Sequence, residues 1–273
     1  MDKMKLFKLM LTGFALWVLC NTPSLTYSQT FEWAKSLVSR PFQLATSMAV
    51  DNNGDNYLTG GFKQTVDFDP GPGTANLTSA GGTDMFVSKL DASGNFAWAK
   101  RIGGPGTTIA YDMKLDNTGN IYLTGAFQQT VDFDPGPGIT NLTSEGLVDI
   151  FVLKLDGSGN FVWAKRFGGI SRNGASGHGI ALDRSGNIHI TGTFVDSIDF
   201  DPGPGTAILR GAGTSDVFVL KLDANGDFVW VKGIAGSSVE IGYKIEVDAS
   251  GNVYSIGEFE GTQILIQGQE SKT

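Results

Sequence analysis

The chain has 273 residues, with 28 acidic residues against 20 basic ones and a formal net charge of −8. It contains no basic run or arginine cluster, which argues against recognition of a nucleic-acid backbone. Its 38 glycines and 9 prolines are too few for a disordered chain and fit an ordered β protein with many turns.

Residues 1–28 have the layout of a cleaved secretory signal. Lys3, Lys5 and Lys8 supply a positive start, and residues 9–20 form an apolar run that is short for a transmembrane helix. Thr26 and Ser28 then place small residues three and one positions before Gln29. We therefore expect export through the inner membrane and a secreted or cell-surface protein, with no transmembrane segment after cleavage.

Cys20 suggests a second interpretation, a lipid-anchored precursor that is cut just before the cysteine. That cut requires a small residue upstream, whereas Leu19 is bulky. Cys20 is the only cysteine, so residues 29–273 contain none and form no disulfide. The stability of this domain has to come from packing and sheet hydrogen bonds.

Three landmarks repeat along residues 29–273 with one period, and such a period decides the architecture. The heptapeptide Asp-Phe-Asp-Pro-Gly-Pro-Gly occurs at 67–73, 132–138 and 199–205, at spacings of 65 and 67 residues. The same spacings separate two further sets of residues: Trp33, Trp98, Trp163 and Trp230, and Asp51, Asp116, Asp183 and Asp248.

Within one unit, apolar and aromatic residues alternate with the period of two that is typical of strands. In the central copy, residues 110–116 and 120–127 form a first pair of runs, and residues 149–156 and 160–167 form a second. A short Asp-x-x-Gly-Asn turn joins each pair, and this is the pattern of a hairpin. Four strands per tandem unit predict an all-β fold of β-propeller blades; the alternative is a linear β-solenoid of the same repeats.

Two blocks of the central copy carry a family resemblance. The sequences GNIYLTG (119–125) and DIFVLKLDGSGNFVWAKRFGG (149–169) resemble the bacterial repeat family called SBBP, from "seven-bladed β-propeller". The heptapeptide insertion is similar to copies in surface and secreted proteins of Bacteroidetes-type bacteria. The resemblance implies a propeller fold, and it implies no particular activity.

The units do not divide the chain evenly. Residues 47–103, 109–168 and 178–235 form three complete units, whereas the fourth consists of residues 243–248 and 252–259. In one interpretation, residues 31–35 join this last hairpin and residues 263–267 (QILIQ) stand in for the missing strand, which closes a four-bladed ring. In the other, which we favour, the chain is a truncated member of a larger propeller, with open blade edges available for strand pairing.

Paired aspartates in the heptapeptides are the main candidates for a metal site. The members of each pair are two residues apart and face one side of a strand, where neighbouring blades would present an acidic arc to calcium. The candidate ligands are Asp67, Asp69, Asp132, Asp134, Asp199 and Asp201. In the alternative interpretation, which we favour, Pro-Gly-Pro-Gly fixes a rigid turn and the aspartates cap backbone amides. No other cofactor is expected.

Other candidate residues are better explained by structure. Residues 51–55 and 223–227 resemble the start of a calcium loop, but Phe62 and Ile234 stand where that loop needs a glutamate. His178 and His189 fall at positions where other units have tyrosine, so we expect structural roles for both. The four repeated tryptophans could form a sugar-stacking ring, but blade packing explains them better.

No nucleophile motif, zinc spacing or phosphate-binding loop is present, and no catalytic residue is assigned. The leading hypothesis is a non-enzymatic secreted or cell-surface scaffold that binds a protein or glycan partner. The alternative is a secreted polysaccharide hydrolase or lyase that uses carboxylates on one propeller face.

Overall fold

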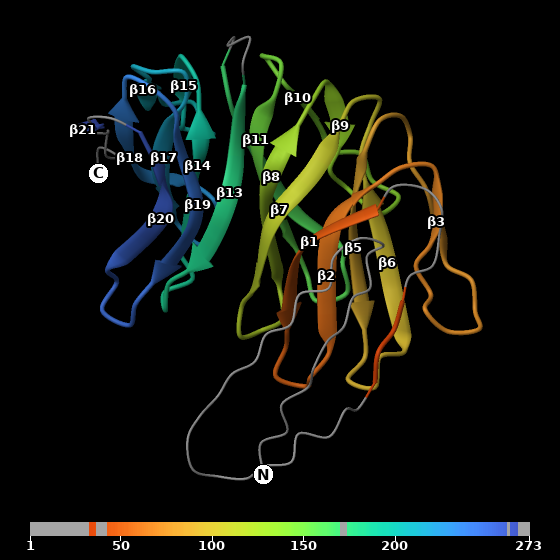
Figure 1. Cartoon of the computed structure of the whole chain (residues 1–273). Helices are drawn as coiled ribbons and strands as arrows, with labels where there is room; N and C mark the ends of the chain where they lie inside the picture. Colours follow the sequence, from red (N-terminus) through yellow and green to blue (C-terminus); the bar gives the residue numbers. More distant parts are fainter. Residues whose placement is uncertain (1–32, 37–42, 170–173, 261–262, 267–273) are drawn as a thin grey trace.

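The computed structural model describes residues 33–36, 43–169, 174–260 and 263–266, and all regular elements in them are strands (Figure 1). The first blade has strand order β1-β2-β5-β6, the second β7-β8-β11-β12, and the third β13-β14-β17-β18-β21. The fourth sheet is the pair β19-β20. The bounds are β1 (Gln43–Val50), β2 (Asn56–Phe62), β5 (Asp84–Leu90), β6 (Phe96–Ile102), β7 (Thr108–Leu115), β8 (Ile121–Phe127), β11 (Asp149–Leu155), β12 (Phe161–Phe167), β13 (Ala175–Leu182), β14 (Ile188–Phe194), β17 (Asp216–Leu222), β18 (Phe228–Gly236), β19 (Glu240–Val247), β20 (Val253–Phe259) and β21 (Gln263–Ile266).

Each complete blade carries a short two-stranded ribbon between its second and third long strands. The ribbons are β3 (Thr65–Asp67) with β4 (Asn76–Thr78), β9 (Thr130–Asp132) with β10 (Asn141–Thr143), and β15 (Ser197–Asp199) with β16 (Ile208–Arg210). The heptapeptide follows the first strand of each ribbon and sends its phenylalanine into the blade core. Phe133, for example, is fully buried and contacts the rings of Phe127 and Phe151.

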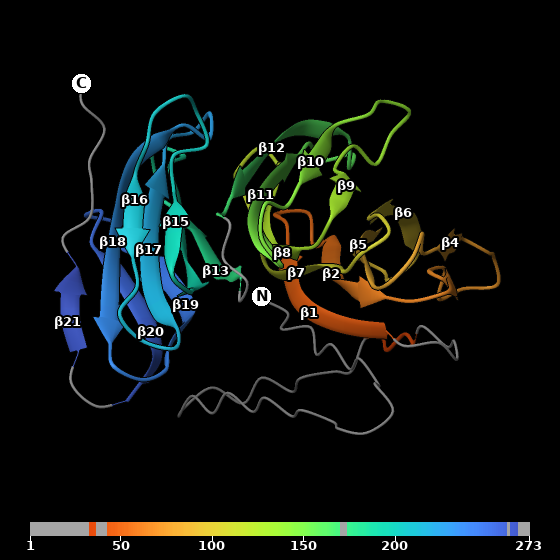
Figure 2. The same ribbon diagram turned by 90° about the horizontal axis from the view of Figure 1, so that it is seen from above.

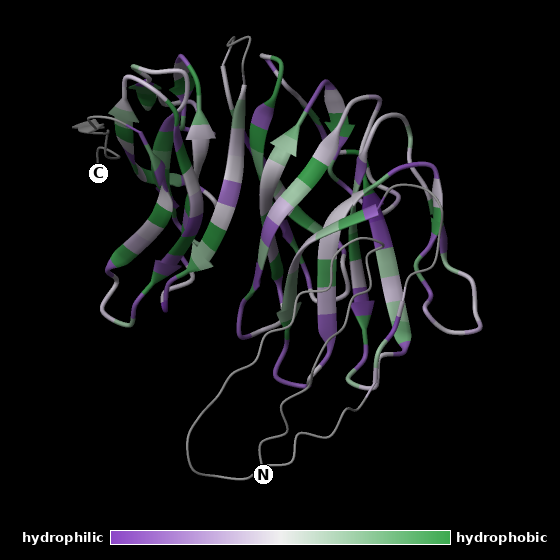
Figure 3. Cartoon of the chain, in the orientation of Figure 1, coloured by the Kyte–Doolittle hydropathy of each residue, from purple (hydrophilic) through white to green (hydrophobic). Residues whose placement is uncertain are grey.

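The Asp-x-x-Gly-Asn segments form the predicted hairpin turns. In the first of them, the Gly54 amide donates to the Asp51 carbonyl oxygen at 3.0 Å, and the Asp55 amide donates to Asp51 Oδ1 at 3.0 Å. Gly54 has φ of 84°, a conformation that favours glycine. Apolar residues gather in the strands between these turns, and polar residues gather at the strand ends (Figure 3).

The blades lie side by side around a common axis and form an open arc (Figure 2). Ion pairs join the innermost strands of the second and fourth sheets, which are not neighbours in the arc. Lys114 Nζ lies 2.7 Å from Glu246 Oε1, and Lys244 Nζ lies 3.0 Å from Asp112 Oδ1. Units two apart in a linear stack would not meet, so these contacts favour the propeller over the solenoid. The fold is an all-β propeller of four-stranded blades.

The alternative interpretation, a closed four-bladed ring, differs from the structure in two respects. The β21 strand pairs with β18 and extends the third blade, instead of completing the β19-β20 sheet. Trp33 packs against the first blade, with its Nε1 donating to the Ala92 carbonyl oxygen at 3.3 Å, and residues 33–36 form no strand. The structure therefore does not join the N-terminal segment to the last hairpin.

The position of β21 has a physical reason in the repeat. In the first two blades, the residue after the fourth strand bridges to the ribbon of the next blade, as Gly103 does to Asp132 and Gly168 to Asp199. The fourth unit lacks the Asp-Phe-Asp-Pro-Gly-Pro-Gly heptapeptide. The equivalent residue, Ala235, pairs in the same way with Ile264 of β21, which stands at the repeat position of Asp132 and Asp199. The last strand thus satisfies an edge that a proline-rich ribbon satisfies elsewhere.

Candidate functional site

A polar cleft of about 330 Å³ lies between the outer strand of the second blade and the ribbon of the third. It joins residues of two blades, so the radial packing creates it. It is lined by Leu142, Glu145, Ala164, Lys165, Arg166, Gly168, Asp199, Asp201, Pro202 and Gly203. One of the three predicted aspartate pairs, Asp199 and Asp201, lies in this cleft.

The aspartates of the heptapeptide cap backbone amides in all three copies. In the third blade, Asp199 Oδ1 accepts from the amides of Asp201 (3.0 Å) and Ala207 (2.8 Å), and Asp201 Oδ1 accepts from Gly203 at 2.8 Å. A Cβ at Gly205 would overlap the Asp201 carboxylate, so a larger residue here would displace that side chain from its position. The same bonds recur around Asp67 and Asp69 and around Asp132 and Asp134.

This geometry supports the rigid-turn interpretation of the heptapeptide. The cleft places its acidic pair near Lys165 and Arg166 of the preceding blade, and no second acidic pair lines it. Among the residues with described positions, no three metal-ligating side chains come together. Calcium binding by the heptapeptide aspartates therefore stays a prediction.

Arg166 organises the charges on the second-blade wall of the cleft. Its Nη1 lies 2.8 Å from Oδ2 of the fully buried Asp149, and its Nη2 lies 2.6 Å from Glu145 Oε1. Burial alone would lower the pKa of Arg166, but hydrogen bonds with these two carboxylates raise it. Arg101 forms the same pair with Asp84 in the first blade, at 2.6 Å. The carboxylates that line the cleft already have hydrogen-bond or ion-pair partners.

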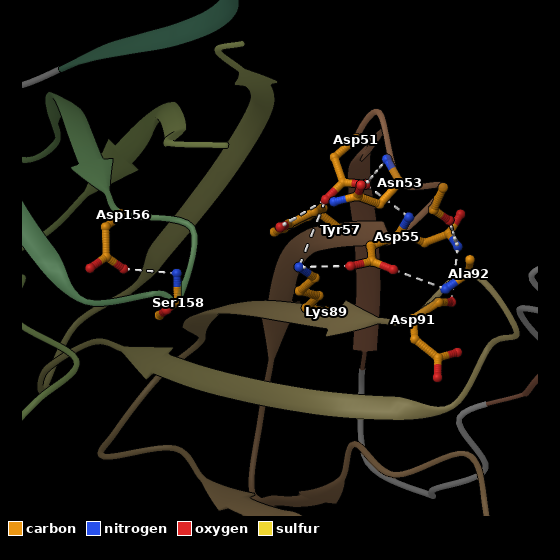
Figure 4. A network of polar contacts seen from close by, with 11 residues as sticks. Asp51, Asn53, Asp55, Tyr57, Lys89, Asp91, Ala92, Asp156 and Ser158 are labelled. Atoms are coloured by element: carbon orange, nitrogen blue, oxygen red, sulfur yellow. Dashed lines mark hydrogen bonds and ion pairs between the residues drawn. The ribbon is translucent and has the colours of Figure 1, made fainter. Parts of the chain in front are cut away.

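The strand-turn networks explain why one tyrosine position accepts a histidine. In the first blade, Lys89 bridges Asp55 (2.9 Å) and Asp51 (3.8 Å), and the Tyr57 hydroxyl donates to Asp51 Oδ2 at 3.4 Å (Figure 4). In the third blade, His189 Nε2 takes the place of the hydroxyl, 3.3 Å from Asp183 Oδ2. Burial lowers the pKa of His189, which keeps the ring neutral.

Asp183 and His178 also have partners within the blades. Burial would raise the pKa of Asp183, but hydrogen bonds from Asn187, His189 and Lys221 hold it well below its usual range. The ring of His178 lies edge-on to Tyr111, with a centroid distance of 5.3 Å, and its Nδ1 lies 2.9 Å from the Gly242 carbonyl oxygen. Both histidines therefore occupy the aromatic positions that the repeat predicts.

The tryptophans pack between blades instead of forming a ring. Trp98 lies beside Gly159 in the turn of the second blade, and Trp163 lies beside Gly226 in the turn of the third. Trp33 has the same relation to Gly94 of the first blade. Their repetition therefore reflects contacts between successive blades.

Sequence reasoning missed a polar junction on the inner strands. Asp112, 5% exposed, accepts from Ser47 Oγ at 2.9 Å and from the Ile180 amide at 3.1 Å, besides its ion pair with Lys244. One residue thus ties the second blade to the three other sheets. The sequence contains a signal for this junction. At the positions equivalent to Asp112, the other units carry Ser47, Gly179 and Lys244, so Asp112 is the acidic residue of the set.

Comparisons with known proteins agree with this fold. Residues 97–126 and 162–193 match the family model described as the β-propeller repeat, SBBP. Each match covers the outer strand of one blade and the first two strands of the next. These matches and the four-stranded blades define a β-propeller repeat domain.

Two curated proteins are similar over part of the chain. The uncharacterized WD repeat-containing protein L264 of Acanthamoeba polyphaga mimivirus is 30% identical over 196 residues, which cover 63% of this chain and 14% of that protein. The regulatory protein FlaEY of Caulobacter vibrioides is 24% identical over 177 residues, which cover 59% of this chain and 18% of that protein. The chain spans less than a fifth of the length of these relatives. No helix in the described ranges is long and apolar enough to cross a membrane.

Proposed function

We propose that this chain is a non-enzymatic secreted or cell-surface scaffold that binds a protein partner at the open edge of β20. The unpaired edge of β20 is the main support for this proposal. The equivalent strands β2, β8 and β14 each pair on both sides, whereas β20 pairs within the described residues only with β19. An unpaired strand edge offers a row of backbone donors and acceptors to an added strand.

The side chains of this sheet support the same proposal. Tyr254 and Ile256 are 58% and 65% exposed, although their equivalents on β8, Tyr122 and Thr124, are buried against the next blade. Tyr243 and Phe259 add further exposed apolar surface. An apolar patch next to a free strand edge suits an extended peptide with alternating apolar residues.

The complete blades indicate the chemistry of the partner strand. In the second blade, the strand beside β8 is Asp149–Leu155 (DIFVLKL), which pairs antiparallel with it. We expect β20 to bind a synthetic peptide of residues 149–167, measured by fluorescence anisotropy. Ile256→Asp should weaken binding roughly tenfold, a change typical of an interface anchor. Ile139→Asp, at a 77% exposed loop position, is the matched control.

Equal binding of the peptide to both variants, or to neither variant nor the parent chain, would contradict the edge proposal. Cleavage of a polysaccharide by the purified chain would instead favour the hydrolase or lyase alternative. Export has a separate test, N-terminal sequencing of the chain produced in a bacterial host. We expect the exported protein to start at Gln29. A glycan array probed with the same sample tests the glycan alternative.

A further inference from the structure

Each complete blade contains one fully buried aspartate at the start of its third long strand. These residues are Asp84, Asp149 and Asp216. In the first two blades an arginine of the fourth strand neutralises the carboxylate, as described above for Arg101 and Arg166. The arginines pair in register with Phe86 and Phe151, and the residue in register with the equivalent Phe218 is Gly233. Within the described part of the chain, the third blade therefore keeps the buried aspartate and has no arginine at this position.

A second change at the same junction adds another negative charge. Glu240 begins β19, and its amide donates to the Ser215 carbonyl oxygen at 3.0 Å. At the two earlier junctions, the equivalent amides belong to Thr108 and Ala175. Glu240 is fully buried, and neither of its carboxylate oxygens has a hydrogen-bond partner among the described residues. Where the other blades have an aspartate and an arginine, this one has an aspartate and a glutamate.

The two carboxylates flank the same backbone segment. The Gly236 amide donates to Asp216 Oδ1 at 3.2 Å, and the Ala212 amide donates to Asp216 Oδ2 at 3.0 Å. A Cβ at Gly236 would overlap Glu240 Oε1. Burial first, and then the charge of Asp216, raises the pKa of Glu240. A buried carboxylate with no partner is costly, so the site calls for a compensating positive charge.

Two backbone carbonyl oxygens approach Gly213, whose amide lies 3.5 Å from Asp216 Oδ2. A Cβ at Gly213 would lie 2.6 Å from the Ser238 carbonyl oxygen, which accepts from the Thr214 amide at 2.8 Å, and 2.7 Å from that of Gly236. Glu260 accepts from Ser238 Oγ at 2.6 Å and adds negative potential. Carboxylates and backbone carbonyls in an irregular loop are the donors that calcium accepts, whereas magnesium demands a more regular octahedron.

We propose that Asp216 and Glu240 bind a calcium ion at the junction between the third blade and β19. The ion replaces the arginine that the other two junctions carry. It anchors the start of the two-stranded fourth sheet to the third blade. This site is separate from the heptapeptide aspartates and from the β20 edge, so it stands or falls independently of the proposed function.

The test is thermal unfolding of the full chain, first stripped with EDTA and then titrated with calcium or magnesium. At a calcium concentration of 100 times Kd, we expect the Tm to rise by about 5–10 °C. Glu240→Gln keeps the shape of the side chain and should abolish this rise. It should also raise the Tm of the calcium-free chain at neutral pH, because it removes the unpaired charge. A chain carrying Asp69→Asn, Asp134→Asn and Asp201→Asn is the matched control and should keep the calcium response.

Three results would overturn the proposal. The first is a Tm that millimolar calcium leaves unchanged. The second is a calcium response that survives Glu240→Gln and is lost in the triple asparagine variant, which would assign the ion to the heptapeptides. The third is a Tm that rises when the pH is lowered through the raised pKa of Glu240 and does not change with calcium. That result would assign a bound proton, and no metal ion, to Asp216 and Glu240.

Discussion

Replacement of Phe133 by alanine tests whether the heptapeptide insertion is a structural part of the blade. Phe133 is fully buried, and its ring centroid lies 5.3 Å from that of Phe127 and 5.1 Å from that of Phe151. Truncation of a buried phenylalanine costs about 3–5 kcal/mol, and aromatic pairs contribute about 0.5–1.5 kcal/mol each beyond area burial. The two ring contacts place Phe133→Ala near 4–5 kcal/mol, at the upper end of the range.

For a domain of this size, that loss corresponds to a decrease in Tm of about 10–20 °C. Differential scanning calorimetry measures it, with Ile139→Ala as control, because Ile139 lies in the same loop and is 77% exposed. The control should change the free energy of unfolding by no more than about 0.5 kcal/mol. A decrease below about 3 °C for Phe133→Ala would refute the view that the insertion completes the blade core.

Two further variants test the charges inside the blades. Arg166→Met leaves Asp149 buried without its cation and should lower the free energy of unfolding by about 3 kcal/mol. This is the low end for a broken buried pair, because Arg166 is partly exposed. Urea unfolding measures the loss, and a loss equal to that of Arg184→Met, at an exposed position, would contradict this. His189→Tyr restores the residue of the other blades. Burial lowers the pKa of His189, so the unfolded chain binds more protons, and wild-type stability falls as pH drops through about 6.5 towards the lowered pKa. The Tm of the variant should fall less between pH 7.5 and 5, and parallel curves would refute the assignment.

Local patterns account for most of the fold that the sequence predicts. The period, the hairpins and the number of complete blades follow from alternation and from turns such as Asp51–Asp55, which depend on neighbouring residues alone. The placing of His178 and His189 at aromatic positions also follows from the period. The heptapeptide was interpretable in the same way, because its aspartates bond amides within eight residues.

The tertiary structure decided what depends on distant partners. Residues 263–266 are predicted to form a strand, but their pairing with β18 depends on the packing that brings the fourth unit beside the outer strand of the third blade. The cleft exists because the third ribbon meets β12 of another blade. Asp112 and Lys244 meet only because the inner strands converge on one axis.

The junction at Glu240 separates what the sequence determines from what packing decides. The sequence by itself determined that a glycine replaces an arginine and that a glutamate follows. It did not determine that Glu240 and Asp216 are both buried around Gly236, because the cost of a buried charge depends on the solvent and partners that packing leaves around it. Sequence therefore specified the repeated blade, whereas packing decided where its exceptions meet.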